Sequence, residues 1–437
     1  MKKLSAHIFS VLAAAAVLSF SVTGCAAGDT GRKNISFSWW GGQSRHDATV
    51  SAVKSFEEKH SDISIDVQFG AWDGWEDSMT AAFYAGNQSD IIQINLNWIQ
   101  EYNSDGSLFL DLNTLSGNFD FSNYRKEELE LCTSDGMLQA VPVSLTGRIF
   151  FWNRATFEKA GLDIPHSLDE LYKAGEKFRN ELGEGYYPLA LGEYDRMMLM
   201  IYRLSSVYGR PWISDGKLNY SESEIKEGID FIASLESAGV IPTVAEIAGN
   251  GAVTFDKSPE WMNGKYAGIF EWDSAALKYA QALENSDAFT VGRYFEDMGD
   301  YDGGYTKISS AFAVSSKTRY PAECAEFLNY ILNDPEGAAC MGVERGIPLS
   351  TSGLAACEKA GLLNGSEAEA NRRVMEWSSF SLDVNFENPK LKVSPEGVYY
   401  DVFSGLSYGD YSPEQAAKLI YDGVTEVLKS NFQGAAE

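Results

Sequence analysis

The chain has 437 residues, of which 44% are hydrophobic and 22% charged, and its formal net charge at pH 7 is −27. Such an acidic surface repels the phosphates of nucleic acids and of anionic lipids, so no nucleic-acid partner is expected. Once an N-terminal signal is removed, roughly 410 residues remain, which exceeds the size at which a single hydrophobic core stops growing. We therefore expect two lobes.

Residues 1–24 have the order of a secretory signal: two lysines, an apolar run over 8–20, and small residues directly before Cys25. The apolar run is shorter than the about 20 residues that a membrane-spanning helix needs. The residues around Cys25 resemble a bacterial lipobox. This resemblance implies that Cys25 is lipidated and becomes the first residue of a protein anchored to the outer face of the bacterial cytoplasmic membrane. We expect the polar residues 25–34 to form a linker.

Beyond the linker, strands and helices alternate. Short apolar runs at 35–39, 63–69 and 90–94 predict strands, and the apolar spacing at 47–59 predicts an amphipathic helix. Further helices are predicted at 169–178, behind a serine cap, and at 197–207. This alternation favours an open α/β sheet, and the absence of a repeat of fixed period argues against solenoids and propellers.

Catalytic and metal-binding motifs are weak. His46, His60 and His166 each sit in a polar setting, which predicts solvated side chains. Ser407 is at the centre of a GxSxG pattern, but a turn follows it where a nucleophile elbow needs a helix. Acids at 297, 300 and 302 lack the alternation and closing glutamate of a calcium loop. We therefore predict no catalytic residue, no metal site and no cofactor.

Two questions stay open at this stage. A glycoside hydrolase needs only two carboxylates at the correct separation, and 62 acidic residues supply many pairs. A secreted glycoside hydrolase acting on polysaccharide is therefore the alternative function. The cysteines at 132, 324, 340 and 357 form no CxxC pair, and whether Cys324 and Cys340 form a disulfide is undecided.

Tryptophans beside glycine and small polar residues near predicted strand ends carry the main functional signal. A sugar ring has an apolar C–H face and a polar hydroxyl rim, so its site combines flat aromatic rings with amide and carboxylate partners. In open α/β sheets, ligands bind beyond the carboxyl ends of the strands. The candidate ligand-binding residues are Trp39, Trp40, Gly41, Trp72, Asp73, Asn97, Trp98, Glu271 and Trp272.

An ordered series of short motifs resembles the family 1 extracellular solute-binding proteins, the sugar-capturing components of carbohydrate importers of the ATP-binding-cassette type. The resemblance extends over nearly the whole mature chain. The motifs lie at 37–42, 90–94, 135–143, 151–154, 261–268, 313–316 and 346–350.

The resemblance implies two discontinuous α/β lobes joined by a hinge, the periplasmic-binding-protein type II fold. The N-terminal lobe would comprise 34–143 and 306–347, and the C-terminal lobe 144–305 and 348–437. The chain would cross between them near 141–147, 305–313 and 346–350. The family also implies that the lobes close on a sugar without breaking a bond, that Trp272 and Tyr400 stack on it, and that permease subunits receive it. We expect a monomer.

Within the family, three segments are similar to members that serve acidic oligosaccharides such as oligogalacturonides: 39–42 with His46, 72–74, and 146–148. Arg148 in the last segment offers a guanidinium that can clamp a uronic carboxylate through two hydrogen bonds. Members that bind neutral oligosaccharides also place an arginine near the first crossing. The ligand is thus predicted to be a neutral or a uronic acid-containing oligosaccharide.

Overall fold

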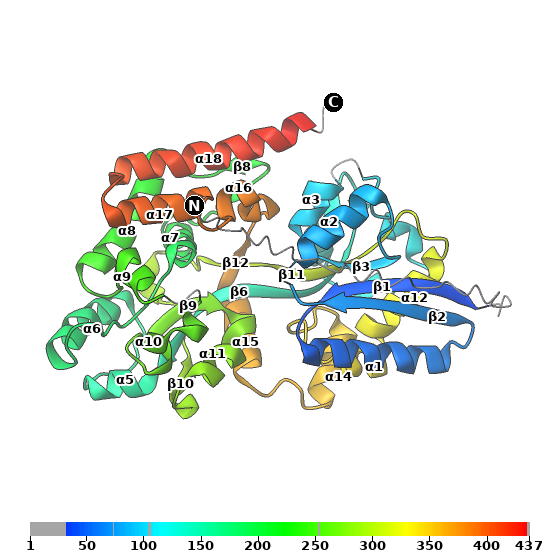
Figure 1. Cartoon of the computed structure of the whole chain (residues 1–437), viewed down its shortest axis with the longest axis horizontal. Coiled ribbons are helices and arrows are strands. Elements are labelled where there is room, and N and C mark those ends of the chain that lie inside the picture. Colours follow the sequence, from blue (N-terminus) through cyan, green and yellow to red (C-terminus); the bar gives the residue numbers. More distant parts are fainter. Residues whose placement is uncertain (1–31, 73, 104–105, 252–253, 435–437) are drawn as a thin grey trace, which may run out of the picture.

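The computed structural model describes residues 32–434, apart from 73, 104–105 and 252–253. The predicted signal and the predicted lipid-anchor residue Cys25 lie outside the described residues. Two groups of elements stand at the two ends of the long axis, and two long strands, β6 and β11, run between them (Figure 1). The crossing strands are β6 (Val141–Asn153) and β11 (Gly304–Val314).

The N-terminal group is built on parallel strands β1, β2 and β3, with helices on both faces. Its strands are β1 (Lys33–Trp40), β2 (Ile63–Gly70), β3 (Ile91–Ile94), β4 (Thr133–Ser134) and β5 (Met137–Leu138). Its helices are α1 (Gln43–Lys59), α2 (Trp75–Ala85), α3 (Asn97–Tyr102), η1 (Leu112–Leu115), η2 (Phe121–Asn123), α4 (Lys126–Glu130), α12 (Pro321–Asn333), α13 (Pro335–Met341) and α14 (Thr351–Lys359).

The C-terminal group is mostly helical. Its strands are β7 (Ile213–Ser214), β8 (Lys217–Leu218), β9 (Gly268–Trp272), β10 (Phe289–Val291) and β12 (Ser378–Ser381). Its α-helices are α5 (Arg154–Lys159), α6 (Leu168–Glu181), α7 (Glu193–Tyr208), α8 (Glu222–Ser237), α9 (Val244–Gly249), α10 (Pro259–Met262), α11 (Ala276–Ala282), α15 (Ser366–Trp377), α16 (Pro389–Lys392), α17 (Val398–Tyr408) and α18 (Pro413–Gly434). Its short 3-10 helices are η3 (Phe255–Lys257), η4 (Asp273–Ala275), η5 (Ser286–Ala288), η6 (Glu296–Met298) and η7 (Val384–Glu387).

Two separate hydrophobic cores correspond to the two groups. One core draws its buried residues from 35–145 and 308–341, and the other from 149–305 and 370–428. In the first core, Ile35 and Phe37 of β1 are fully buried, and α1 turns Ala52, Val53 and Phe56 inward. Because each core is assembled from distant parts of the chain, each lobe is discontinuous. The predicted two-lobed α/β fold is confirmed.

Strands β6 and β11 belong to both lobes. The first half of β6 pairs antiparallel with β11, and its second half pairs with β9, where Arg148 is opposite Trp272. The far end of β11 pairs with β3 of the N-terminal lobe, and its first residues pair with β12. The ladder between β6 and β11 is irregular between Ile308 and Ala311. These two strands are therefore the connections about which the lobes can rotate.

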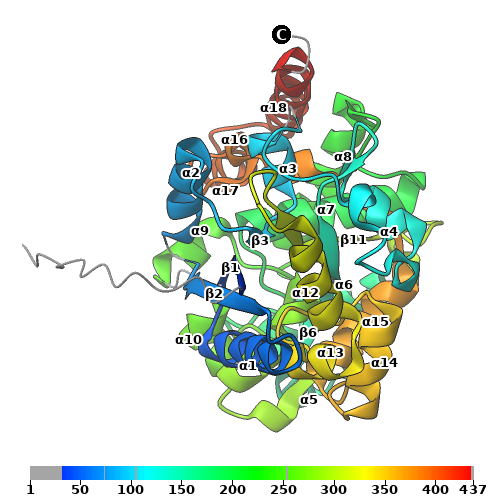
Figure 2. The same cartoon turned by 90° about the vertical axis from the view of Figure 1, so that its right-hand side faces the viewer.

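The third crossing lies later in the chain than the predicted segment 346–350. Helix α14 packs on α12 and α13 of the N-terminal lobe (Figure 2). Just before it, the Ser350 hydroxyl donates to Asn333 over 2.7 Å. Helix α15, by contrast, packs on β6 and α11. We therefore place the crossing at 360–365 and assign α14 to the N-terminal lobe, not to the C-terminal lobe.

Several side chains weighed in the sequence now have definite surroundings. His46 is buried, not solvated: α1 begins already at Gln43, so His46 faces inward, where its Nδ1 accepts a hydrogen bond of 3.1 Å from Trp39. Ser407 lies inside α17 and accepts from the Val244 N–H over 3.0 Å, which is not an elbow. All four described cysteines are free thiols.

Two features are absent from the described ranges. In that part of the chain, no helix combines the length and the apolar character needed to cross a bilayer. Within the same ranges, no three His, Cys, Asp or Glu side chains come together in a group that could hold a metal ion.

Candidate functional site

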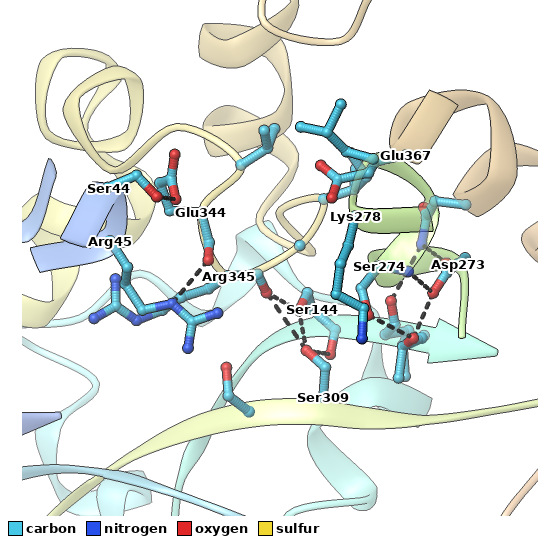
Figure 3. A pocket seen from close by; sticks show the side chains of 18 of the residues that line it. Ser44, Arg45, Ser144, Asp273, Ser274, Lys278, Ser309, Glu344, Arg345 and Glu367 are labelled. Carbon is cyan, nitrogen blue, oxygen red and sulfur yellow. Dashed lines mark hydrogen bonds between the residues drawn. The ribbon is translucent and has the colours of Figure 1, made fainter. Parts of the chain in front are cut away.

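A cavity of about 520 Å³ lies between the two lobes (Figure 3). This volume is within the range typical of sites for small molecules. The N-terminal lobe and its following turn contribute Trp40, Ser44, Arg45, Gln93, Asn95, Val343, Glu344, Arg345, Gly346 and Ile347. The crossing strands contribute Ser144, Leu145, Thr146, Ser309 and Ser310, and the C-terminal lobe Asp273, Ser274, Leu277, Lys278, Gln281, Glu367 and Asn371.

The cavity is where the topology of the sheet places it. Trp40 is the last residue of β1, Asn95 directly follows β3, and both line the cavity. Asp273 and Ser274 directly follow β9 in the other lobe. Since the carboxyl ends of strands in open α/β sheets are the usual place for ligands, this cavity is the first candidate for the binding site.

The C-terminal side of the cavity is built around a buried carboxylate. Asp273 is only 1% exposed and accepts hydrogen bonds from Thr146 Oγ1, from Asn371 Nδ2 over 2.6 Å and from its neighbour's backbone N–H over 2.8 Å. Burial raises the pKa of Asp273 above its usual value. This carboxylate ties β6, β9 and α15 together and fixes one wall of the cavity.

The opposite side is cationic. Arg45 donates to the backbone oxygens of Glu344 and Trp40, over 2.8 and 3.2 Å. Arg345 is 5% exposed and donates to Gln93 Oε1 and Thr49 Oγ1, over 2.9 Å each. Burial lowers the pKa of both arginines. Figure 3 shows these two side chains on one side of the cavity, across from Asp273 and Lys278.

The predicted tryptophans of the N-terminal lobe gather in one cluster. The ring centres of Trp40 and Trp72 are 5.1 Å apart, and those of Trp40 and Trp98 are 5.7 Å apart. Trp98 is fully buried and donates to Glu76 over 3.0 Å, whereas Trp72 is 43% exposed. Trp40 therefore connects a buried ring to an exposed one at the rim of the cavity.

The other predicted residues of this lobe differ in their access. Trp39 is fully buried and stacks on Phe69, with ring centres 4.9 Å apart. Packing in the core therefore explains the tryptophan at this position. Gly41 lies under Arg45: a Cβ there would be 2.4 Å from Arg45 Cδ, so only glycine lets that side chain lie across the backbone. Asn97 begins α3 and donates to Glu101 over 3.3 Å. Asp73 lies outside the described residues.

Arg148 is enclosed by acids. Its Nη1 is 2.6 Å from Asp195 and 3.3 Å from Glu271, and the side chain is 3% exposed. Burial alone would lower the pKa of Arg148, but Glu271 and Asp195 outweigh it and raise this pKa above its usual value. Burial raises the pKa of Asp195 to about 6, although the positive charge of Arg148 lowers it. The guanidinium predicted to clamp a ligand is thus already neutralised within the protein.

Trp272 lies between this cluster and β11. The Arg148 guanidinium lies 4.8 Å from the centre of the Trp272 ring, and the Lys307 ammonium lies 4.7 Å from it. Burial lowers the pKa of Lys307 to about 8, although its ion pair with Glu387, at 2.5 Å, opposes this. Burial would raise the pKa of Glu387, but Lys307 and Lys392 lower it to about 2.

Tyr400 borders a second cavity of about 390 Å³ inside the C-terminal lobe, which Arg148, Glu271, Tyr194 and Asp195 also line. Tyr400 stacks on Tyr194, with an angle of 13° between the rings. Burial raises the pKa of Tyr400 to about 12. The predicted residues Arg148, Glu271, Trp272 and Tyr400 are therefore neighbours in space.

Sequence reasoning missed the polar lining of the inter-lobe cavity. Arg45, Lys278 and Arg345 belong to no motif, Gln93 lies in the motif at 90–94 without having been assigned a role, and the four are far apart in the chain. One signal was present: Arg345 immediately precedes the motif at 346–350, and Gly346, with which that motif begins, has a left-handed φ of 90°.

The sequence profile described as bacterial extracellular solute-binding protein matches residues 42–338 of this chain. Putative binding proteins of Brucella abortus and Brucella suis are 26% identical to it over 137 residues. That match covers 30% of this chain and 32% of each relative, so it reaches about a third of the relatives' length.

Two solved structures resemble the whole described fold. A periplasmic solute binding protein from Pectobacterium atrosepticum is 27% identical, with a TM-score of 0.83, and the match covers 91% of this chain and 99% of that one. A periplasmic oligogalacturonide binding protein from Yersinia enterocolitica, solved with saturated digalacturonic acid, is 28% identical, with a TM-score of 0.80 and the same coverage of both chains.

Proposed function

The chain belongs to the bacterial extracellular solute-binding protein family, and we propose that it captures an oligosaccharide between its lobes for an ATP-binding-cassette carbohydrate importer. The family resemblance noted in the sequence is thereby confirmed. The family is described by binding and not by catalysis, so it gives the alternative of a glycoside hydrolase no support. The observation that carries the proposal is the polar cavity between the lobes, with Trp40 in its lining and Trp72 packed beside Trp40.

Capture would proceed by closure of the lobes. Trp40 and Trp72 would stack on the apolar faces of sugar rings, and the amide and carboxylate groups of the cavity would bind their hydroxyl groups. Rotation about β6 and β11 would then bring the two walls together and exclude water. No cofactor takes part, and the chemistry of ATP hydrolysis belongs to another protein. Permease subunits would recognise the closed form.

The relative from Yersinia enterocolitica supports an acidic oligosaccharide as the ligand, since that protein was solved with digalacturonic acid. The cationic side of the cavity agrees with such a ligand. We propose an oligogalacturonide as the first ligand to test, with a neutral oligosaccharide as the comparison.

Calorimetric titration of the mature chain with digalacturonate and with neutral disaccharides tests this function. We expect binding of an oligosaccharide at micromolar concentration or tighter, with the sugar recovered intact by chromatography. Shorter products that disappear on substitution of a cavity carboxylate, such as Asp273→Asn, would instead favour the hydrolase. Absence of binding to every acidic and neutral oligosaccharide would contradict the proposal.

We further propose that the protein is a monomer tethered by a lipid on Cys25 at the outer face of the cytoplasmic membrane. The lipobox-like residues before Cys25 support this anchor. Expressed in a bacterial host, Cys25→Ser is expected to be exported but to leave the membrane fraction for the medium. Unchanged partition of Cys25→Ser into detergent with the membranes would contradict the anchor.

A further inference from the structure

We propose that Arg45 and Arg345 form a subsite for a carboxylate of the bound ligand, which makes the ligand of the inter-lobe cavity an anionic sugar. This inference rests on the proposed function and names the part of the cleft that selects the ligand. Arg148, the arginine that the sequence suggested for this role, is a partner of Asp195 and Glu271 and contributes no free charge.

The first reason is that the two arginines lack a carboxylate. Among the described residues, the buried arginines 148 and 196 each have a carboxylate oxygen at 2.6 Å. Neither Arg45 nor Arg345 has one within 4.0 Å in that part of the chain. The Glu344 carboxylate lines the same cavity and opposes the lowering of both arginine pKa values, but it is beyond 4.0 Å from either guanidinium and accepts from Ser44 over 2.6 Å. Arg345 is buried and Arg45 is half-buried; holding such cations away from water without a carboxylate contact is costly, and a ligand carboxylate would remove that cost.

The second reason is a set of unused polar atoms. Arg345 Nη2, Gln93 Nε2 and Ser310 Oγ are buried and have no hydrogen-bond partner. All three residues are at most 5% exposed and line the same cavity. Native proteins rarely leave buried donors unpaired. Each of these atoms can therefore form a hydrogen bond with a ligand, since the described residues provide no partner. Two of these atoms are N–H donors, and a carboxylate oxygen is their natural acceptor.

The third reason is preorganisation. The Arg345 guanidinium lies 5.4 Å from the centre of the Phe312 ring, and Gln93 and Thr49 hold it from two further sides. Arg45 is held by two backbone oxygens and lies across Gly41. Side chains that are already fixed lose little entropy when a ligand binds. The arrangement therefore suits the two parallel hydrogen bonds that a guanidinium makes with a carboxylate.

The charge across the cavity favours a sugar acid over a more highly charged anion. Asp273 and Glu367 line the wall opposite the arginines. Lys278 on that wall is paired with Asp256 over 3.1 Å. Burial raises the pKa of Asp273 and that of Glu367. Carboxyl and amide oxygens accept hydrogen bonds from hydroxyl groups and repel a phosphate dianion. One end of the cavity thus suits a carboxylate and the other end suits hydroxyl groups, as in a uronic acid.

Titration calorimetry with digalacturonate and its dimethyl ester tests the subsite, because the two ligands differ only in the masked charge. We expect the wild type to bind the free acid about 10- to 100-fold more tightly, the range of a charged hydrogen-bonded contact. In Arg45→Gln this ratio is expected to fall towards one. The matched control is Lys54→Gln, which removes one positive charge from an exposed position on the same helix. Equal binding of acid and ester by the wild type, or an unchanged ratio in Arg45→Gln, would overturn the subsite while leaving oligosaccharide binding in place.

If neither ligand binds, the oligogalacturonide proposal fails and the subsite is judged by a simpler probe. Sodium acetate at constant ionic strength is then expected to raise the melting temperature of the wild type but not that of Arg45→Gln, since a ligand stabilises only the state that binds it. Ser310→Ala, a small change at an unpaired hydroxyl, provides a second variant in case Arg45→Gln does not fold. An equal response of the wild type and the variants to acetate would overturn the subsite.

Discussion

Arg148 is buried inside the C-terminal lobe, whereas buried Arg345 and half-buried Arg45 line the N-terminal side of the inter-lobe cavity, and of the three only Arg148 has a carboxylate partner among the described residues. Arg148 has two carboxylates within 3.3 Å, whereas the described residues supply none within 4.0 Å of Arg45 or Arg345. A compensated arginine holds its lobe together, and an uncompensated arginine is available to a ligand. The comparison teaches that the counter-ion, and not the position near a crossing strand, decides which arginine can bind an anionic sugar.

Arg148→Met is expected to have the largest effect. It leaves Asp195 and Glu271 buried without their cation, which should lower the free energy of unfolding by about 3–5 kcal/mol. Without Arg148 the pKa of Asp195 should rise further above about 6, its value in the intact protein. A folded-state pKa above the unfolded value gives stability that is lost as pH rises through it. The variant should therefore melt higher at pH 5 than at pH 8, and the opposite order in calorimetry would contradict this role.

Glu387→Gln probes the second compensated cluster. Lys307 and Lys392 hold the folded pKa of Glu387 at about 2, below the usual 4.5 of a glutamate. A depressed pKa gives stability that is present above about 4.5 and lost as pH falls towards about 2, worth up to about 3 kcal/mol. Denaturant unfolding of the variant should show that much less stability at pH 7. Between pH 4.5 and 2 its stability should fall less steeply than that of the wild type, and parallel pH profiles would refute the assignment.

Trp272→Ala and Trp72→Ala separate a ring packed against two cations from a half-exposed ring at the edge of the tryptophan cluster. Trp272 contacts Arg148 and Lys307, so its loss should weaken both the fold and sugar binding, each by about 1–3 kcal/mol. Trp72 is 43% exposed, so its loss should weaken sugar binding by a similar amount and leave the melting temperature of the free protein nearly unchanged. Binding and melting should be measured on both variants; a large destabilisation by Trp72→Ala alone would reverse the comparison.

Arg345→Met is the matched counterpart of Arg148→Met and should have the smallest effect on the free protein. The variant loses the hydrogen bonds of Arg345 to Gln93 and Thr49, which destabilises the fold. It also removes a buried cation that has no carboxylate partner among the described residues, which stabilises the fold and offsets that loss. The free energy of unfolding should stay within about 1 kcal/mol of the wild type, since an apolar side chain of similar volume often replaces a buried ion without cost. A loss as large as that of Arg148→Met would mean that Arg345 is structural.

The strands and helices of the fold were predictable because their signals are local. The runs at 35–39 and 63–69 lie within β1 and β2, and the helix predicted at 169–178 lies within α6, which Ser167 caps over 3.1 Å. The third crossing was misplaced, because packing of α14 on α13 is a long-range choice that no motif encodes.

The candidate site was predictable only in its aromatic part. A tryptophan beside glycine is visible in the sequence, and the rings of Trp40 and Trp72 do lie together. The charge state of an arginine is not visible, because it depends on a partner that can be far away: Asp195 lies on α7 and Arg148 on β6. For the same reason the unpaired donors of Gln93 and Arg345 became apparent only in the folded chain.

A crystal structure of the mature chain grown with digalacturonate tests the account most directly. We predict the sugar in the cavity between the lobes, beside Trp40, with one carboxylate at about 2.9 Å from the guanidinium groups of Arg45 and Arg345. Asp195 and Glu271 should still hold Arg148. A sugar carboxylate bound to Arg148, with Arg45 and Arg345 untouched, would contradict the account.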